Sequence, residues 1–281
     1  MNEKEFAKIK DLAEQGNADA QFELGEYYLG VEDDDNEAFH WYLLAAQQGH
    51  IKAQYAVGDC YAIGEGVDVD WDEAYRWYML SAQQGYAEAQ FDVAECIATG
   101  TGVEENKQEA VSWYIKAAHG GYDFAQNVLG ILYEEGDIVP QDYTQAAKWY
   151  QLAADQGSCE AQYNLGCLYL NGQGVDKDYG RAFELFSLAA TDYKHGSISA
   201  LTNMGYCYEY GYGVSKNLEK AVEYYLLAAN RWDATAAYNL GECYEFGNGV
   251  EKDLEKALYW YQIAADRGDE DAQKKAQELI K

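Results

Sequence analysis

Apolar and small residues recur along the 281-residue chain with a period close to 36 residues. The segment that begins at Ala89 matches the rest of the chain when it is shifted by this period. Each copy opens with an alanine, at Ala20, Ala53, Ala89, Ala125, Ala161, Ala200, Ala236 and Ala272. The spacings of 33, 36, 36, 36, 39, 36 and 36 residues define seven repeats. We expect the partial copies, residues 1–19 and 272–281, to act as caps.

The first half of each repeat has the apolar pattern of a helix. Apolar residues stand at positions one, five, eight and nine, which share one helical face. A leucine-like residue and a glycine occupy positions five and six at Leu24-Gly25, Val57-Gly58, Leu129-Gly130, Leu165-Gly166, Met204-Gly205 and Leu240-Gly241. Position nine is tyrosine except at Ile97.

A G-x-G-V turn separates this helix from a second one. The turns are Gly64–Val67, Gly100–Val103, Gly172–Val175, Gly211–Val214 and Gly247–Val250. Their first glycine suits the left-handed conformation that ends a helix. An Asp or Asn that can begin a helix follows, at Asp70, Asn106, Asp178, Asn217 and Asp253. The second helix carries A-x-x-W-Y-x-x-A-A, and its paired alanines allow close approach between helices.

Two helices per repeat cannot bury both of their faces alone, so neighbouring repeats must stack. We therefore predict an all-α fold that forms one domain over residues 1–281. The expected architecture is a right-handed αα solenoid of seven repeats, with the first helix of each repeat on the concave side.

The charge is strongly negative and unevenly spread. The chain has a formal net charge of −29, of which −21 falls in residues 1–140 and −8 in residues 141–281. Such a field repels nucleic acids and anionic membranes and attracts basic partners. A need for solubility explains the total charge but leaves its asymmetry unexplained.

The chain shows no signal-peptide pattern and no stretch of eighteen apolar residues. We therefore expect a cytoplasmic protein that does not insert into membranes. The six cysteines include no CxxC pair, so a zinc site is not indicated. Four of them share position eight of the first helix, where small apolar core residues fit: Cys60, Cys96, Cys207 and Cys243.

The repeat resembles the Sel-one-like repeat (SLR) family, a relative of the tetratricopeptide repeat. The resemblance covers residues 6–281 and implies an αα solenoid that serves as an adaptor, scaffold or inhibitor, without catalytic residues. Some secreted relatives link the two helices of a repeat by a disulfide. That pairing is absent here, so reduced thiols are expected. Four segments depart from the pattern: Gly30–Asp35, Gly136–Val139, Asp192–His195 and Trp232-Asp233. Such loops mark either a working surface or simple drift.

No catalytic, cofactor or metal site is predicted. The G-x-G turn follows a helix and lacks the Gly-Lys-Ser/Thr of a phosphate-binding loop. No two histidines share a helix at the spacing of metal ligands. The acidic run Glu32–Asp35 lacks the alternating ligands and central glycine of a calcium loop, so a solvated turn is the better interpretation.

The resemblance implies that positions three, seven, ten and eleven of the first helix face the concave groove. The predicted partner-binding residues are Phe22, Glu26, Tyr55, Asp59, Phe91, Glu95, Tyr163, Tyr206, Tyr210, Tyr238 and Glu242. Positions three and seven adjoin across one helical turn. Their rings and carboxylates would receive Lys and Arg side chains of a basic segment. The alternative is that position three packs within the repeat and position seven is merely solvated.

Three functions remain open at this stage. The first is a non-catalytic adaptor or scaffold that binds a protein or peptide, with a basic segment in the groove. The second is a dedicated inhibitor, such as an immunity protein for a basic toxin, because opposite fields speed capture. The third, an enzyme such as a hydrolase, finds no convergent group of catalytic residues in the sequence.

Overall fold

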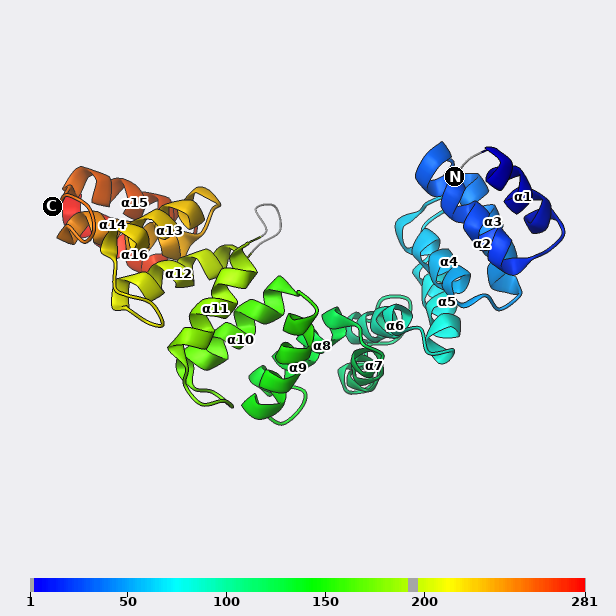
Figure 1. The fold of residues 1–281 in the computed structure, drawn as a ribbon, viewed down its shortest axis with the longest axis horizontal. Helices are drawn as coiled ribbons and strands as arrows, with labels where there is room; N and C mark the ends of the chain where they lie inside the picture. Colours follow the sequence, from blue (N-terminus) through cyan, green and yellow to red (C-terminus); the bar gives the residue numbers. More distant parts are fainter. Residues whose placement is uncertain (1–2, 192–196, 281) are drawn as a thin grey trace. The chain divides into compact units, whose positions relative to one another are not determined.

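The computed structural model describes residues 3–191 and 197–280, and this part of the chain is helical, without strands, as predicted. The chain divides into two compact units, residues 1–129 and 130–281 (Figure 1). The helices are α1 (Glu3–Glu14), α2 (Ala18–Tyr27), the short π-helix η1 (Tyr28–Glu32), α3 (Asp35–Gln47), α4 (Ile51–Ile63), α5 (Trp71–Gln83), α6 (Ala87–Thr99), α7 (Lys107–His119), α8 (Asp123–Glu135), α9 (Tyr143–Asp155), α10 (Cys159–Asn171), α11 (Tyr179–Ala190), α12 (Ile198–Tyr210), α13 (Leu218–Asn230), α14 (Ala234–Phe246), α15 (Leu254–Asp266) and α16 (Glu270–Ile280).

Helix starts follow from side-chain caps. Each Asp or Asn predicted to begin a second helix is its N-cap, and the side-chain oxygen accepts a hydrogen bond from a backbone N–H of the first turn. Four of the first helices start two residues before the alanine that opens the repeat, and Asn17, Ser158, Ser197 and Asp233 cap them in the same way.

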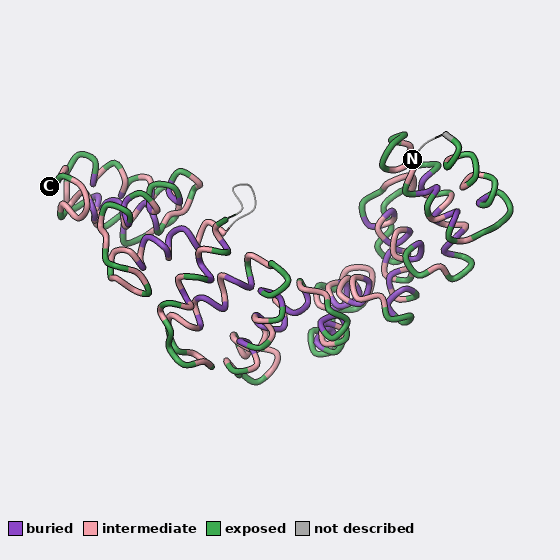
Figure 2. Tube along the Cα trace, viewed as in Figure 1, coloured by how far each residue is buried: buried purple, intermediate pink, exposed green. Residues whose placement is uncertain are grey.

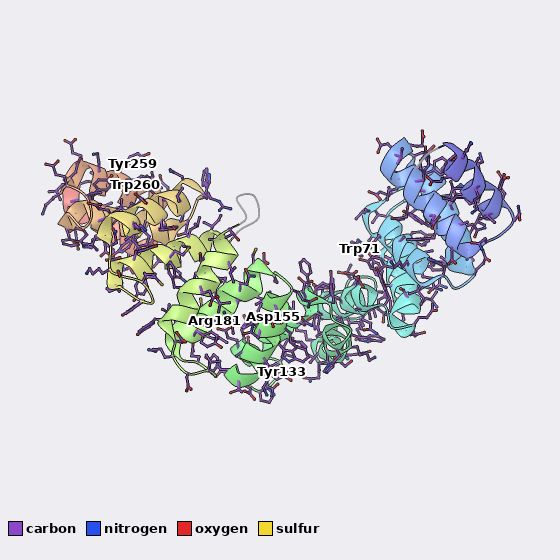
Figure 3. All side chains as sticks on the ribbon, in the orientation of Figure 1. Trp71, Tyr133, Asp155, Arg181, Tyr259 and Trp260 are labelled. Carbon is purple, nitrogen blue, oxygen red and sulfur yellow. The ribbon has the colours of Figure 1, made fainter. Side chains whose placement is uncertain are left out.

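Both glycines of the G-x-G-V turn are required by the backbone. The first one ends the helix in the left-handed region, as predicted, with φ of 83° at Gly64 and 73° at Gly100. The second glycine also has positive φ and touches the start of the second helix of the preceding repeat. A Cβ at Gly102 would lie 2.1 Å from the carbonyl oxygen of Trp71, which opens α5 and is labelled in Figure 3. Only glycine fits there, so this turn joins neighbouring repeats.

Within a repeat, the two helices meet where position six lacks a side chain. The ring of Tyr78 packs against Gly58, where a Cβ would be 2.5 Å from it. Position five and the paired alanines complete a fully buried seam, which includes Val57 and Ala82. The buried segments in Figure 2 follow these facing sides of the helices, and exposed segments lie on the loops and outer faces.

Between repeats, a buried glutamine at position two sets the register. The amide nitrogen of Gln90 donates a 3.1 Å hydrogen bond to the carbonyl oxygen of Ala82 at the end of the preceding α5. Four other repeats make the same bond from Gln21, Gln54, Gln126 and Gln162. In these five repeats, the first helix is therefore tied to the second helix before it, whereas Leu201 and Ala237 stand at position two of the last two repeats.

The departures from the repeat have local structural causes. Residues 28–32 form the π-helix η1, and Asp33 ends it at φ 55°, so this repeat turns without a G-x-G-V motif. Trp232 takes φ 74° at the place where other repeats have glycine, and it is 79% exposed. The predicted longer loop Asp192–His195 lies outside the described residues.

The cysteines lie as the repeat positions predicted. The four at position eight are free thiols, and all four are buried. Burial raises the pKa of each of these four thiols. In the part of the chain that the structure describes, no helix is long and apolar enough to cross a membrane.

Candidate functional site

A cleft of about 450 Å³ opens in residues 1–129, beside the first helices of repeats one and two. We call it the acidic cleft. It is lined by Phe22, Glu26, Leu29, Tyr42, Lys52, Tyr55, Ala56, Asp59, Cys60, Ile63, Glu65 and Tyr86. It holds three carboxyl groups against one lysine, and its lining includes four aromatic rings. Four predicted binding residues, Phe22, Glu26, Tyr55 and Asp59, therefore share one surface.

The cleft carboxylates at position seven are held by tyrosines of the second helices. The hydroxyl of Tyr42 on α3 donates to Glu26 at 2.5 Å, and that of Tyr78 on α5 donates to Asp59 at 2.7 Å. Position seven is therefore neither free nor merely solvated, because each carboxylate has one fixed partner. A carboxylate accepts more than one hydrogen bond, so these groups keep capacity for a ligand.

The position-three rings pack inside the repeat and line the cleft as well. Phe22 lies 5.7 Å from Tyr42 and 4.8 Å from His50, measured between ring centroids. Tyr55 lies 5.6 Å from Tyr78 and 5.2 Å from Tyr86. These contacts fix the ring orientations, so a ligand would meet rigid aromatic edges and faces.

Asp92 on α6 adds a carboxyl group that sequence reasoning missed. It forms a hydrogen bond with Tyr55. Burial raises the pKa of Asp92 to about 6, and burial together with the charges of Asp92 and Glu65 raises the pKa of Asp59 to about 6. The tyrosine hydrogen bonds oppose both shifts without cancelling them. Among the described residues, no cation forms an ion pair with either group.

The other predicted residues of the first unit lie on α6. Glu95 accepts a hydrogen bond from Tyr114, and Phe91 packs 5.7 Å from Tyr114 and 5.3 Å from Tyr122. They repeat the arrangement of Glu26 and Phe22, but neither lines the acidic cleft.

In residues 130–281 the predicted residues fall into separate groups. Tyr206 and Tyr210 on α12 are 4.6 Å apart between ring centroids. Tyr163 on α10 packs 5.9 Å from Phe186. Tyr238 donates to Glu242 on the same helix α14 at 3.3 Å. Within the second unit, these five residues therefore make three separate sets of contacts.

The lining residues that were not predicted include Glu65 and Tyr86. Glu65 is the variable residue of the second repeat's G-x-G turn, and Tyr86 precedes α6. Both positions follow from the repeat once the turn is known to face the cleft. No three His, Cys, Asp or Glu side chains among the described residues are placed to hold a metal ion.

Comparison with known proteins identifies the repeat. A model of the Sel1 repeat matches residues 18–50, 51–86, 87–122, 123–158, 159–192, 198–231 and 234–269. A solved protective antigen of uropathogenic Escherichia coli strains, which displays an SLR fold, is 33% identical, with a TM-score of 0.85 over 98% of this chain and 59% of that chain. A Sel1 repeat protein from Oxalobacter formigenes is 30% identical, with a TM-score of 0.75 over 87% of this chain and 96% of that one.

A curated relative shares a shorter segment. The ERAD-associated E3 ubiquitin-protein ligase component HRD3A of Arabidopsis thaliana is 34% identical over 68 residues, which make up 23% of this chain and 10% of that protein. The chain thus spans a tenth of this relative, and 59% of the length of the Escherichia coli antigen.

Proposed function

The chain belongs to the Sel1 repeat family, and on that premise we propose that it is a non-catalytic scaffold that binds a basic segment of a partner protein in the acidic cleft. Sel1 repeat proteins are generally protein-interaction scaffolds.

One observation carries this proposal: Asp59 is a partly desolvated carboxyl group that lines an aromatic cleft and has no paired cation among the described residues. A Lys or Arg side chain placed there would offset the unfavourable burial of its charge, and the rings of Tyr55 and Phe22 would add cation–π contacts. Each exposed contact contributes only about 0.5–1 kcal/mol, so several must act together.

The negative charge of the first unit also favours a basic partner. Residues 1–129 contain 25 acidic and 7 basic side chains, a net charge of −18. Opposite charge on a partner would speed its association, and salt would slow it. A dedicated inhibitor of a basic toxin or effector would use this surface in the same way, and it remains our second candidate because of that charge.

The test compares two variants with equal charge changes. In the cleft variant, Glu26→Gln, Asp59→Asn and Glu65→Gln neutralise the lining. In the control variant, Glu23→Gln, Asp68→Asn and Glu104→Gln neutralise exposed carboxylates elsewhere in the same unit. Both serve as bait beside the unchanged chain, and captured proteins are identified by mass spectrometry.

We expect a basic partner that the unchanged chain and the control variant retain and the cleft variant loses. The rate at which it associates with the unchanged chain should fall steeply between 50 and 300 mM salt, because salt screens the attraction between opposite charges. A partner retained equally by all three baits would show that the cleft is not the binding surface. One tight partner would favour an inhibitor, and several weaker ones would favour an adaptor.

The proposal extends to location and to excluded partners. We propose a cytoplasmic location, because the four buried cysteines at position eight are free thiols and reducing conditions keep thiols in that state. Its net charge of −29 argues against nucleic acids and anionic membrane surfaces as partners.

A further inference from the structure

The last repeat binds a cation of its own chain. The Nζ of Lys275 on α16 lies 3.2 Å from the Glu245 carboxylate, 5.4 Å from the ring centroid of Phe246 and 6.0 Å from that of Tyr261. The hydroxyl of Tyr261 donates to the same Glu245 carboxylate at 2.6 Å. We call Glu245, Phe246 and Tyr261 the lysine site. It shows directly that one carboxylate and two rings in this arrangement hold an ammonium group.

The same arrangement recurs one repeat earlier without its lysine. The equivalents of the lysine site, 36 residues earlier in the sequence, are Glu209, Tyr210 and Tyr225. The hydroxyl of Tyr225 donates to Glu209 at 2.7 Å, which reproduces the tyrosine–carboxylate pair. At the place of Lys275 stands Asn239. Throughout the described residues, no lysine or arginine pairs with Glu209 or lies over the Tyr210 ring.

The surroundings of this second arrangement favour a cation. Tyr210 is 52% exposed, and the negative charge of Glu209 is the main cause that raises its pKa. Tyr206 lies 4.6 Å and Tyr212 5.7 Å from Tyr210, and Tyr179 stacks on Tyr212 at 4.2 Å. The rings therefore form a continuous aromatic surface beside a carboxylate. The negative face of an aromatic ring attracts a cation, as the carboxylate does.

We propose that Glu209 and Tyr210, flanked by Tyr206 and Tyr212, form a second binding site that receives one lysine side chain of a partner protein, in the place that Lys275 takes in the last repeat. The inference shares the basic partner of the proposed function but rests on other residues, in the other unit. The occupant is charged and single, because the internal example holds one ammonium group.

The strongest test fills the site from within the chain. Asn239→Lys places an ammonium group at the position equivalent to Lys275 and leaves Glu209 and its tyrosine bond intact. Asn239→Gln controls for the substitution, and Gln262→Lys on α15 adds the same charge at an exposed position. The probe is a fluorescein-labelled peptide with three Gly-Ser-Lys units, and its dissociation constant with the full chain is measured by fluorescence anisotropy.

The background for this test is a chain with Glu26→Gln and Asp59→Asn, which weakens the acidic cleft. We expect Asn239→Lys to raise the dissociation constant about fivefold, the loss of one cation–π and ion-pair contact, relative to both controls. Equal binding by Asn239→Lys and Gln262→Lys would overturn the second site. If the peptide responds to the cleft substitutions alone, the proposed function stands and this inference fails.

The reciprocal experiment opens the occupied site. Lys275→Asn should expose the lysine site to the peptide and tighten its binding about fivefold relative to Lys274→Asn, which removes the same charge from an exposed neighbour. Lys274→Asn therefore separates the local site from the general field. No gain of Lys275→Asn over Lys274→Asn would show that this arrangement does not recognise an external lysine.

Discussion

Replacing Asp59 by asparagine should stabilise the chain at neutral pH, although it removes a residue of the proposed binding site. Burial is the main cause that raises the pKa of Asp59 from 3.8 to about 6, so its ionised form is disfavoured in the folded chain. A raised carboxyl pKa makes folding less favourable once the group ionises. The cost is nearly absent below about pH 4, grows as the pH rises towards 6, and is complete above that. Asparagine keeps an acceptor for the Tyr78 hydroxyl and carries no charge.

The magnitude follows from the pKa difference. At 1.36 kcal/mol per pKa unit, the shift corresponds to a loss of about 3 kcal/mol in the free energy of unfolding at pH 8. Water around the partly exposed carboxyl group reduces this loss to about 1–2 kcal/mol. Urea unfolding followed by circular dichroism at pH 4 and pH 8 measures it. The free energy of unfolding of Asp59→Asn should exceed that of the unchanged chain by about 1–2 kcal/mol at pH 8 and match it closely at pH 4.

The exposed Glu23→Gln substitution is the matched control and should change little at either pH. If Asp59→Asn is no more stable than the unchanged chain at pH 8, burial does not strain this carboxylate. A gap of the same size at pH 4 would equally refute the reasoning, because the effect would then not come from ionisation. The combination of higher stability with weaker partner binding would indicate that the carboxylate is kept for function.

Three further predictions concern the fold. Gly85→Ala should lower the free energy of unfolding by about 1–2 kcal/mol, because of its positive φ alone. Gly102→Ala should lower it by a further ~2 kcal/mol, because its Cβ would meet the Trp71 carbonyl at 2.1 Å. Equal thermal unfolding of the two variants would contradict this. Gln90→Leu should lower the free energy of unfolding in urea by only about 1 kcal/mol, since the Ala82 carbonyl keeps its hydrogen bond from the Gly85 N–H. A loss beyond ~3 kcal/mol would show that the Gln90 side chain has a larger role in stability. The four position-eight thiols should resist a thiol-specific reagent in the folded chain, because they are buried with raised pKa; labelling at the unfolded rate would disprove their burial.

The fold could be predicted because each signal is local and repeats. Asp70 caps α5 through its own side chain, and Gly64 ends α4 in the left-handed region, so neither depends on distant contacts. The sequence motif predicts no separate role for the second glycine of the turn. Its actual role at Gly102 depends on the carbonyl of a residue in the preceding repeat, and such an approach is visible only in three dimensions.

The candidate site could be predicted only in part. The family resemblance implies that Glu26 and Asp59 face one groove, and both line the acidic cleft. The tyrosine hydroxyls that hold them come from the second helices, and their reach depends on helix separation. In the second unit the same tyrosine bonds pass to position ten, as at Glu209, so one position does not define the role. Asp92 gave no signal, because its raised pKa arises mainly from burial, which depends on how the repeats pack in three dimensions.

The contact of Gly102 with Trp71 also has a consequence for how this protein can diversify. The meeting of turn and helix is made between main-chain atoms, and the identity of neighbouring side chains hardly enters it. Substitutions on the open surface can therefore accumulate without altering how adjacent modules are fitted together. Whole repeats could be duplicated or exchanged during evolution. Each added repeat could bring its own binding residues while the main-chain contact between repeats stays the same.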